Sequence, residues 1–133
     1  MTKKMPTIVV VDDSITSISV YQFSVEPLAV NFMSFKSSDE VLPYLQEHKP
    51  DLLFLDIIMP GMDGLSLLKN LRDLTHLQGT PVIMVTSKDY AQDRYVAKQL
   101  GAVDFLIKPL RFQEIRDLVC KYTDVNYKSS TQS

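Results

Sequence analysis

Residues 52–64 read LLFLDIIMPGMDG, and this stretch decides the fold. Its first four residues are apolar without a break, which is typical of a strand buried on both faces of a parallel sheet. Asp56 follows directly, and Pro60, Gly61 and Gly64 then mark a loop. Ligands of open α/β sheets bind outside the carboxyl ends of the strands. A carboxylate at this place is therefore a candidate site residue.

Three further apolar runs end in polar residues in the same way. They are residues 7–11, closed by Asp12 and Asp13; 81–85, closed by Thr86 and Ser87; and 103–107, closed by Lys108 and Pro109. Taken singly, each polar residue has an ordinary structural explanation, such as a helix cap or a solvated lysine. Because the carboxyl ends of parallel strands share one edge of the sheet, we expect Asp12, Asp13, Asp56, Thr86 and Lys108 to converge on one crevice.

Helical patterns alternate with the strand-like runs along the whole chain. Five β–α units in about 120 residues imply an α/β fold with a parallel sheet between two helical layers. The fourth helix is the least apolar, so it is a candidate moving or partner-binding element. A weak strand is expected at 28–33, and helices are expected at 14–25, from 37 onward with a kink at Pro43, after 64, at 90–100 and at 112–122. The residues expected to face inward are Leu65, Leu68, Leu71 and Leu74 in the third helix and Ala91, Val96 and Leu100 in the fourth. In the last helix, one face is expected to carry Phe112, Ile115, Val119 and Tyr122.

Composition sets the broad class of the protein. The 133 residues are 45% hydrophobic and 23% charged, with a net charge of -2, which gives no reason to expect direct nucleic-acid binding. The single cysteine, Cys120, fits a reducing compartment. No signal peptide or membrane-length apolar run is visible, so a cytoplasmic location without membrane contact is expected. Residues 1–122 are expected to form one domain, and the polar residues 123–133 a disordered tail.

The polar cluster suits metal-assisted phosphoryl transfer. Three carboxylates within a few ångströms repel one another unless a cation lies among them, and hard oxygen ligands favour Mg²⁺. Asp56 is the candidate nucleophile, which would form an acyl phosphate. Lys108 offers a positive charge, and Thr86 a hydroxyl, to the phosphoryl oxygens. Neither His48 nor His76 is expected in this site.

With these motifs together, the chain resembles the receiver domains of two-component response regulators, of the single-domain chemotaxis type. The resemblance spans roughly residues 6–122 and rests on residues 9–14, 56–64, 85–87, and 101–102 through 108–109. It implies a three-layer (βα)5 flavodoxin-like sandwich with sheet order 2-1-3-4-5 and a cis peptide before Pro109. It also implies that Asp56 is the phosphoacceptor and that Mg²⁺ is held by Asp13, by Asp12 largely through water, by Asp56 and by the backbone carbonyl of Ile58.

The family switch couples a strand-end hydroxyl to an aromatic residue on the last strand, here Thr86 and Phe105. Phe105 lacks a phenol oxygen, so it can turn inward without a hydrogen-bond partner, which favours the inward rotamer even without phosphate. A purely structural role in the core is the alternative for Phe105. Ile58 and Lys88 match positions that tune the phosphoryl lifetime. An apolar Ile58 cannot orient an attacking water, which predicts slow self-dephosphorylation.

The resemblance implies a signalling module that catalyses its own phosphorylation and dephosphorylation rather than an enzyme with a separate substrate. A histidine kinase or histidine phosphotransfer protein would supply the phosphoryl group. A downstream protein would bind the face of the fourth helix, last strand and last helix, and the resemblance allows a dimer on phosphorylation. The chain is expected to act alone or as a relay intermediate.

Three alternatives stay open at this point. The first is an N-terminal receiver of a larger regulator with a DNA-binding or enzymatic output domain. The second is a Mg²⁺-dependent phosphatase with an aspartate nucleophile, which normally places a second aspartate where this chain has Ile58. The third is a flavodoxin-like cofactor binder, which Asp12 and Asp13 disfavour because they would repel its phosphate.

Overall fold

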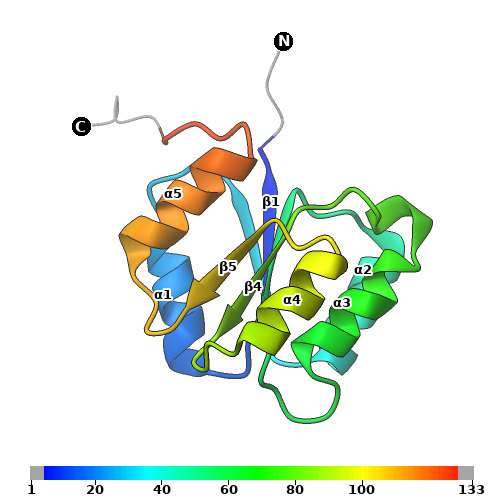
Figure 1. Ribbon diagram of the computed structural model, residues 1–133. Helices are drawn as coiled ribbons and strands as arrows, with labels where there is room; N and C mark the ends of the chain where they lie inside the picture. Colours follow the sequence, from blue (N-terminus) through cyan, green and yellow to red (C-terminus); the bar gives the residue numbers. More distant parts are fainter. Residues whose placement is uncertain (1–4, 129–133) are drawn as a thin grey trace.

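A single parallel sheet forms the middle layer of the computed structural model, which describes residues 5–128 (Figure 1). Its strands are β1 (Thr7–Val11), β2 (Asn31–Phe35), β3 (Leu52–Asp56), β4 (Val82–Thr86) and β5 (Asp104–Ile107). They pair in the order β2-β1-β3-β4-β5. The fold class and the strand order are therefore confirmed. The expected cis peptide between Lys108 and Pro109 is present as well.

Helices α1 and α5 cover one face of the sheet, and α2, α3 and α4 cover the other (Figure 1). Side-chain caps fix three of the helix starts, because Ser14, Ser37 and Asp63 each accept a backbone N–H three residues later. Gly101 follows α4 with φ at 82°, a conformation that favours glycine. The bounds are α1 Ile15–Val25, α2 Ser38–Glu47, α3 Gly64–Arg72, the 3-10 turn η1 Thr75–Leu77, α4 Ala91–Gln99 and α5 Phe112–Tyr122.

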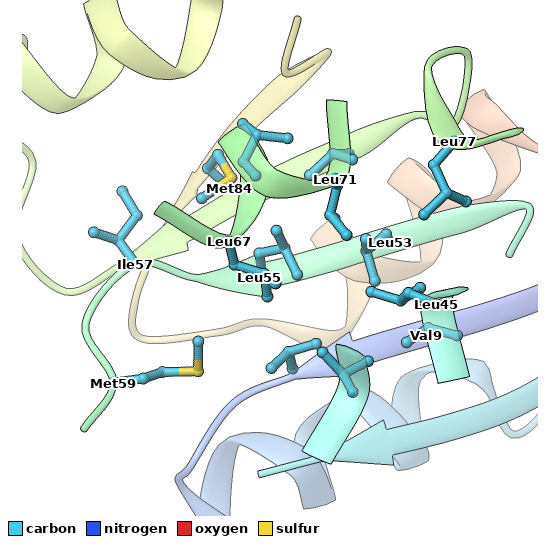
Figure 2. Close-up of a cluster of buried hydrophobic side chains, with 14 of the residues drawn as sticks. Val9, Leu45, Leu53, Leu55, Ile57, Met59, Leu67, Leu71, Leu77 and Met84 are labelled. Atoms are coloured by element: carbon cyan, nitrogen blue, oxygen red, sulfur yellow. The ribbon is translucent and has the colours of Figure 1, made fainter. Parts of the chain in front are cut away.

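Side chains along each strand point alternately to the two faces of the sheet, so the molecule has two buried clusters. Val9 and Val11 of β1 enter the cluster under α2, α3 and α4. Ile8 and Val10 of the same strand enter the cluster under α1 and α5. Figure 2 shows the first cluster, where strand residues Val9, Leu53, Leu55 and Met84 lie against helix residues Leu45, Leu67 and Leu71.

The second strand and the C-terminal tail both differ from the sequence expectation. β2 starts three residues later than expected, and the apolar segment 27–29 before it pairs instead with residues 126–128. The tail up to Lys128 is thus ordered against the body of the protein, while residues 129–133 lie outside the described residues. The bonds of this pairing run from Ala29 N to Asn126 O at 2.7 Å and from Lys128 N to Pro27 O at 2.8 Å. The domain boundary at residue 122 stays a prediction.

Some inward-facing helix residues also differ from the expected stripes. In α3, Leu67 is fully buried beside Leu68 and Leu71, whereas Leu65 is only partly buried. Leu74, which lies beyond the end of α3, is also only partly buried. In α5, Ile115 and Val119 are buried as expected, but Phe112 is exposed and meets the exposed Phe23 edge-on. Ala97, rather than Ala91, is the buried residue of α4. The expectation that α4 is the helix least tied to the core agrees with this single buried residue.

Arg72, at the end of α3, ties several chain segments together. Its guanidinium donates to five backbone carbonyls, which belong to the last residue of η1, to the segment after it and to the residues that follow α4. Burial lowers the pKa of this guanidinium. The acceptors are the carbonyls of Leu77, Gln78, Thr80, Leu100 and Gly101, at 2.9 to 3.3 Å.

Within the part of the chain that the structure describes, no helix combines the length and apolar character needed to span a membrane.

Candidate functional site

The polar strand ends meet at the carboxyl edge of the sheet, as the sequence predicts. Asp12 follows β1, Asp56 is the last residue of β3, and Lys108 follows β5. Carboxylate oxygens of Asp12, Asp13 and Asp56 all lie within 4.8 Å of one another. We call these three residues the acidic cluster. The neighbouring strands β1 and β3 place two of its members side by side, because they pair in register.

Lys108 is the cation of the acidic cluster. Its Nζ lies 3.0 Å from Oδ2 of Asp12 and 3.2 Å from Oδ2 of Asp56. Both carboxylates are almost fully buried, and the lysine side chain is 19% exposed. Backbone N–H groups hold the other oxygens, since Ser14 N donates to Asp12 Oδ1 at 2.9 Å and Ile58 N to Asp56 Oδ1 at 3.3 Å. The two carboxylates are therefore fixed in orientation.

The charges of the acidic cluster shift the pKa values of its members. Burial, with the added repulsion of Asp12, raises the pKa of Asp56 to about 6, although Lys108 acts against this shift. Burial alone would lower the pKa of the Lys108 ammonium, but its interactions with Asp12 and Asp56 outweigh burial and raise that pKa. One ammonium thus balances a set of three carboxylates, which leaves the cluster with excess negative charge.

The donor set of the cluster fits a hard divalent cation. All three side chains offer oxygen, the donor that Mg²⁺ prefers, and Asp13 is exposed at the mouth of the cluster. Oδ2 of Asp12 is buried, and within the described residues it accepts no hydrogen bond, although the Lys108 ammonium lies 3.0 Å away as its ion-pair partner. A metal ion or a water that reached this oxygen would satisfy its remaining hydrogen-bonding capacity.

Thr86 lies at the same edge of the sheet but is turned away from hydrogen bonding with the acidic cluster. Its hydroxyl is fully buried and accepts the backbone N–H of Lys88 at 3.1 Å. Phe105, on the neighbouring strand β5, is half-buried and packs against the cluster under α2, α3 and α4. The ring is thus only partly covered by the core, and its role in switching stays a prediction.

Two loop residues after β3 border the acidic cluster. Ile58 has an exposed side chain, 49% accessible, so an apolar surface stands beside the carboxylate of Asp56. Gly64, which the sequence marks only as a loop residue, also has a role in packing. A Cβ at Gly64 would collide with the backbone carbonyl of Asp56, so only glycine fits there. A lone glycine after a loop gives no sequence signal of such a contact.

The two histidines lie elsewhere, as expected. The ring of His48 stacks on Tyr44 of α2, with centroids 4.5 Å apart. Nε2 of His76 is 2.8 Å from the carbonyl oxygen of Leu45. Both imidazole rings therefore make their contacts with residues of α2.

Comparison with known proteins agrees with this geometry. The chain is 32% identical over 108 residues to the alkaline phosphatase synthesis transcriptional regulatory protein PhoP of Bacillus subtilis, covering 81% of this chain and 44% of PhoP. It is 34% identical over 111 residues to the cyclic di-GMP phosphodiesterase response regulator RpfG of Xanthomonas campestris, covering 82% of this chain and 29% of RpfG. The chain thus matches less than half of the length of either relative.

Solved structures show the same fold. The chemotaxis protein CheY4 of Vibrio cholerae superposes with a TM-score of 0.83 at 22% identity, over 90% of this chain and all of that one. Residues 8–120 match the response regulator receiver domain. This match covers β2 to β5 in full, β1 from its second residue on, and the acidic cluster. The chain therefore belongs to the family of response regulator receiver domains of two-component systems.

Proposed function

We propose that Asp56 accepts a phosphoryl group from the phosphohistidine of a histidine kinase or of a histidine phosphotransfer protein. As a receiver domain, the chain is a signalling module, and this proposal assigns the reacting atoms. The observation that carries it is the position of the Asp56 carboxylate at the end of β3, with Oδ2 3.2 Å from the Lys108 ammonium, inside the acidic cluster. A carboxylate oxygen of Asp56 forms the new O–P bond, and the N–P bond of the donor breaks, with its electron pair returning to the imidazole.

The acidic cluster is the proposed Mg²⁺ site. Asp13 and Asp56 would bind the ion directly, Asp12 largely through water, and the backbone carbonyl of Ile58 would complete the protein ligands. When bound, Mg²⁺ supplies positive charge that neutralises phosphoryl oxygens during transfer. The uncompensated charge of three carboxylates around one ammonium supports this assignment.

Two other residues act on the transferred group in this proposal. Lys108 is a charge partner of Asp56 and would pair with a phosphoryl oxygen once the carboxylate is esterified. Thr86 would give up its bond to Lys88 N and donate its hydroxyl proton to a phosphoryl oxygen. Phe105 would then move into the space that Thr86 leaves. These two movements form the proposed switch between the site and the surface.

The lifetime of the phosphorylated state is proposed to depend on Ile58 and Lys88. Ile58 is an exposed apolar side chain two residues after Asp56, so it offers no polar group to orient a water for attack on the acyl phosphate. Lys88 likewise lies two residues after Thr86, in the exposed loop before α4. We infer slow self-dephosphorylation.

The proposed output is a change in the surface formed by α4, β5 and α5, which a downstream protein reads, with dimerisation on phosphorylation as a second form of output. In PhoP and RpfG the matched region is less than half of the protein, so an attached output domain is the alternative to action by the receiver alone. A histidine kinase partner and a free, exposed Cys120 support a cytoplasmic location.

An intact-mass time course tests the assignment of Asp56. Wild type and Asp56→Asn are incubated with Mg²⁺ and a small phosphodonor, and the mass of the chain is followed. We expect one phosphoryl group on wild type, a slow loss after donor removal, and no gain on Asp56→Asn. Asp39→Asn is the matched control, since it removes a carboxylate from an exposed helix start, and it should gain the group like wild type.

Phosphorylation of Asp56→Asn at the wild-type rate would contradict the proposal. The proposal would also be contradicted if wild type gained no mass while a second receiver in the same tube became phosphorylated.

A further inference from the structure

A second group of charged and aromatic side chains lies on the α4 side of β5. The guanidinium of Arg94, in α4, bonds both carboxylate oxygens of Asp89, at 2.5 and 3.2 Å. The same guanidinium lies over the ring of Phe105, 4.5 Å from its centroid. We call Asp89, Arg94 and Phe105 the Arg94 clamp. It connects the loop before α4 to the last strand.

The geometry of the clamp differs from that of an ordinary surface ion pair. A guanidinium that meets a carboxylate with two parallel bonds is held in one plane, and that plane can stack on an aromatic face. Arg94 makes both contacts at once, two bonds to Asp89 and a position over the ring of Phe105. The hydrogen bond and the charge of Asp89 raise the pKa of Arg94, and those of Arg94 lower the pKa of Asp89.

The clamp is continuous with the proposed site through the loop at residues 86–90. Lys88 N donates to the hydroxyl of Thr86, and the carbonyl of Lys88 accepts Tyr90 N at 3.1 Å. Asp89 lies between these two bonds. The backbone at Asp89 is therefore held in place while the Thr86 hydroxyl accepts the backbone N–H of Lys88. A shift of Thr86 toward a phosphoryl group would require the loop to change, and with it the position of Asp89.

The clamp also shapes the surface. Arg94 and Phe105 line a groove of about 390 Å³ between α4 and β5, together with Lys98, Ala102, Val103 and Asp104. Lys98 lies on the same helix and in the same groove, but within residues 5–128 it makes no ion pair and lies over no ring. It carries the same charge as Arg94 without the contacts of the clamp.

We propose that the Arg94 clamp stabilises the resting arrangement of the 86–90 loop and of the Phe105 ring, so that Arg94 is a positioning residue for the phosphorylation switch. This inference rests on the proposed function of Asp56. In this proposal the clamp is broken when the loop shifts, so it opposes the arrangement that binds a phosphoryl group, and this coupling is reciprocal. Removing the clamp therefore raises the affinity of the site for a phosphoryl mimic.

Titration with beryllofluoride, a phosphoryl mimic, in the presence of Mg²⁺ measures this effect. NMR resonances of the Phe105 ring and of the amides at 86–90 follow the binding. We expect Arg94→Gln and Asp89→Asn each to raise the apparent affinity by about fivefold, within the usual range of such couplings. The double variant should resemble Arg94→Gln, because that substitution alone already removes the contact with Asp89. The affinity of Arg94→Lys should lie between those of wild type and Arg94→Gln, since an ammonium keeps the charge but cannot form two parallel bonds or stack on a ring as a plane.

Lys98→Gln is the matched control, and its affinity should equal that of wild type. Equal affinities for Arg94→Gln and Lys98→Gln, or effects of the two clamp substitutions that simply add, would overturn the clamp while leaving the proposed function of Asp56 intact. A wild-type chain that bound no beryllofluoride would overturn the proposed function and the coupling together. The two failures are thus distinguishable in one experiment.

Discussion

At the scale of single residues, Asp56 combines burial with an unfavourable charge. Its pKa in the folded chain is about 6, above the ordinary 3.8, so the folded chain holds this proton more tightly than the unfolded chain does. The carboxyl is therefore neutral and harmless at low pH, and it destabilises the fold increasingly as the pH rises through about 6. The acceptor role is thus proposed for a group whose charge works against folding.

Replacement of Asp56 by Asn should stabilise the metal-free protein in a pH-dependent way. We expect the free energy of unfolding to rise by about 1 to 2 kcal/mol near pH 8, because the buried charge is gone, and to change little below about pH 4. Urea unfolding in a chelating buffer at several pH values measures this difference. Asp39→Asn, which removes an exposed carboxylate, should show no such trend, and a gain that is equal at both ends of the pH range would refute the explanation.

Ile58 is the second residue for which a substitution is informative. Ile58→Asn places an amide beside Asp56 that can orient a water, so we expect the acyl phosphate to be lost roughly five to ten times faster. The decay of the phosphorylated mass after donor removal measures the rate. Ile58→Val keeps an apolar side chain and should decay like wild type. An unchanged or slower decay in Ile58→Asn would rule out the shielding role of Ile58.

The sequence was a good guide to the acidic cluster for a simple reason. Asp12, Asp56 and Lys108 each follow a buried run, and parallel strands bring their carboxyl ends to one edge whatever the details of packing. Gly64 could not be found in this way, because its constraint is a contact between a loop and the Asp56 carbonyl. The hydrogen bond of Thr86 to Lys88 N is likewise set by the loop conformation, which no periodic pattern encodes.

At the scale of elements, Arg72 holds α3 to the end of α4. Arg72→Met should lower the free energy of unfolding by about 2 to 3 kcal/mol, because several carbonyls lose a charged donor, and some stay buried without a partner. Arg72→Lys should recover little of this loss, since one ammonium cannot reach carbonyls in so many directions. Chemical denaturation measures both variants.

Lys69→Met is the control for Arg72, because it removes a cation from the same last turn of α3, where the side chain is exposed. A loss of stability in Lys69→Met as large as in Arg72→Met would show that helix charge, rather than the carbonyl contacts, is responsible.

The errors in the second strand and in the tail have a common cause. Leu28 is fully buried, which explains why residues 28–30 resemble a strand, but its neighbour is Tyr127, about a hundred positions away. Each segment satisfies the other's backbone bonds. A local pattern shows that a segment is apolar or polar, but it cannot show which distant segment will pair with it. The stripe of α3 was misplaced for a related reason, since a run of three leucines in four positions, at 65–68, fits several helix rotations.

At the scale of the whole molecule, the proposed metal site links ion binding to folding. An ion that binds only the folded chain adds about 2.7 kcal/mol of stability at 100 times its dissociation constant. We therefore expect Mg²⁺ to raise the melting temperature of wild type above that in Na⁺ at matched ionic strength. Asp13→Asn should lose most of this rise without disturbing the packing, because Asp13 is exposed. An equal rise in Asp13→Asn would exclude it as a ligand.

The two described ends of the chain lie at one short segment. Asn31 N donates to the carbonyl of Pro6, and Ala29 N to that of Asn126, so the chain enters and leaves beside residues 27–31 (Figure 1). This segment precedes β2 and is at the amino edge of the sheet, whereas the acidic cluster is at the carboxyl edge. A fluorophore, a surface tether or another folded unit attached at either end would therefore lie on the side of the domain remote from the acidic cluster. The arrangement makes the domain easy to recombine, because neighbours can be exchanged at both ends without blocking access to Asp56.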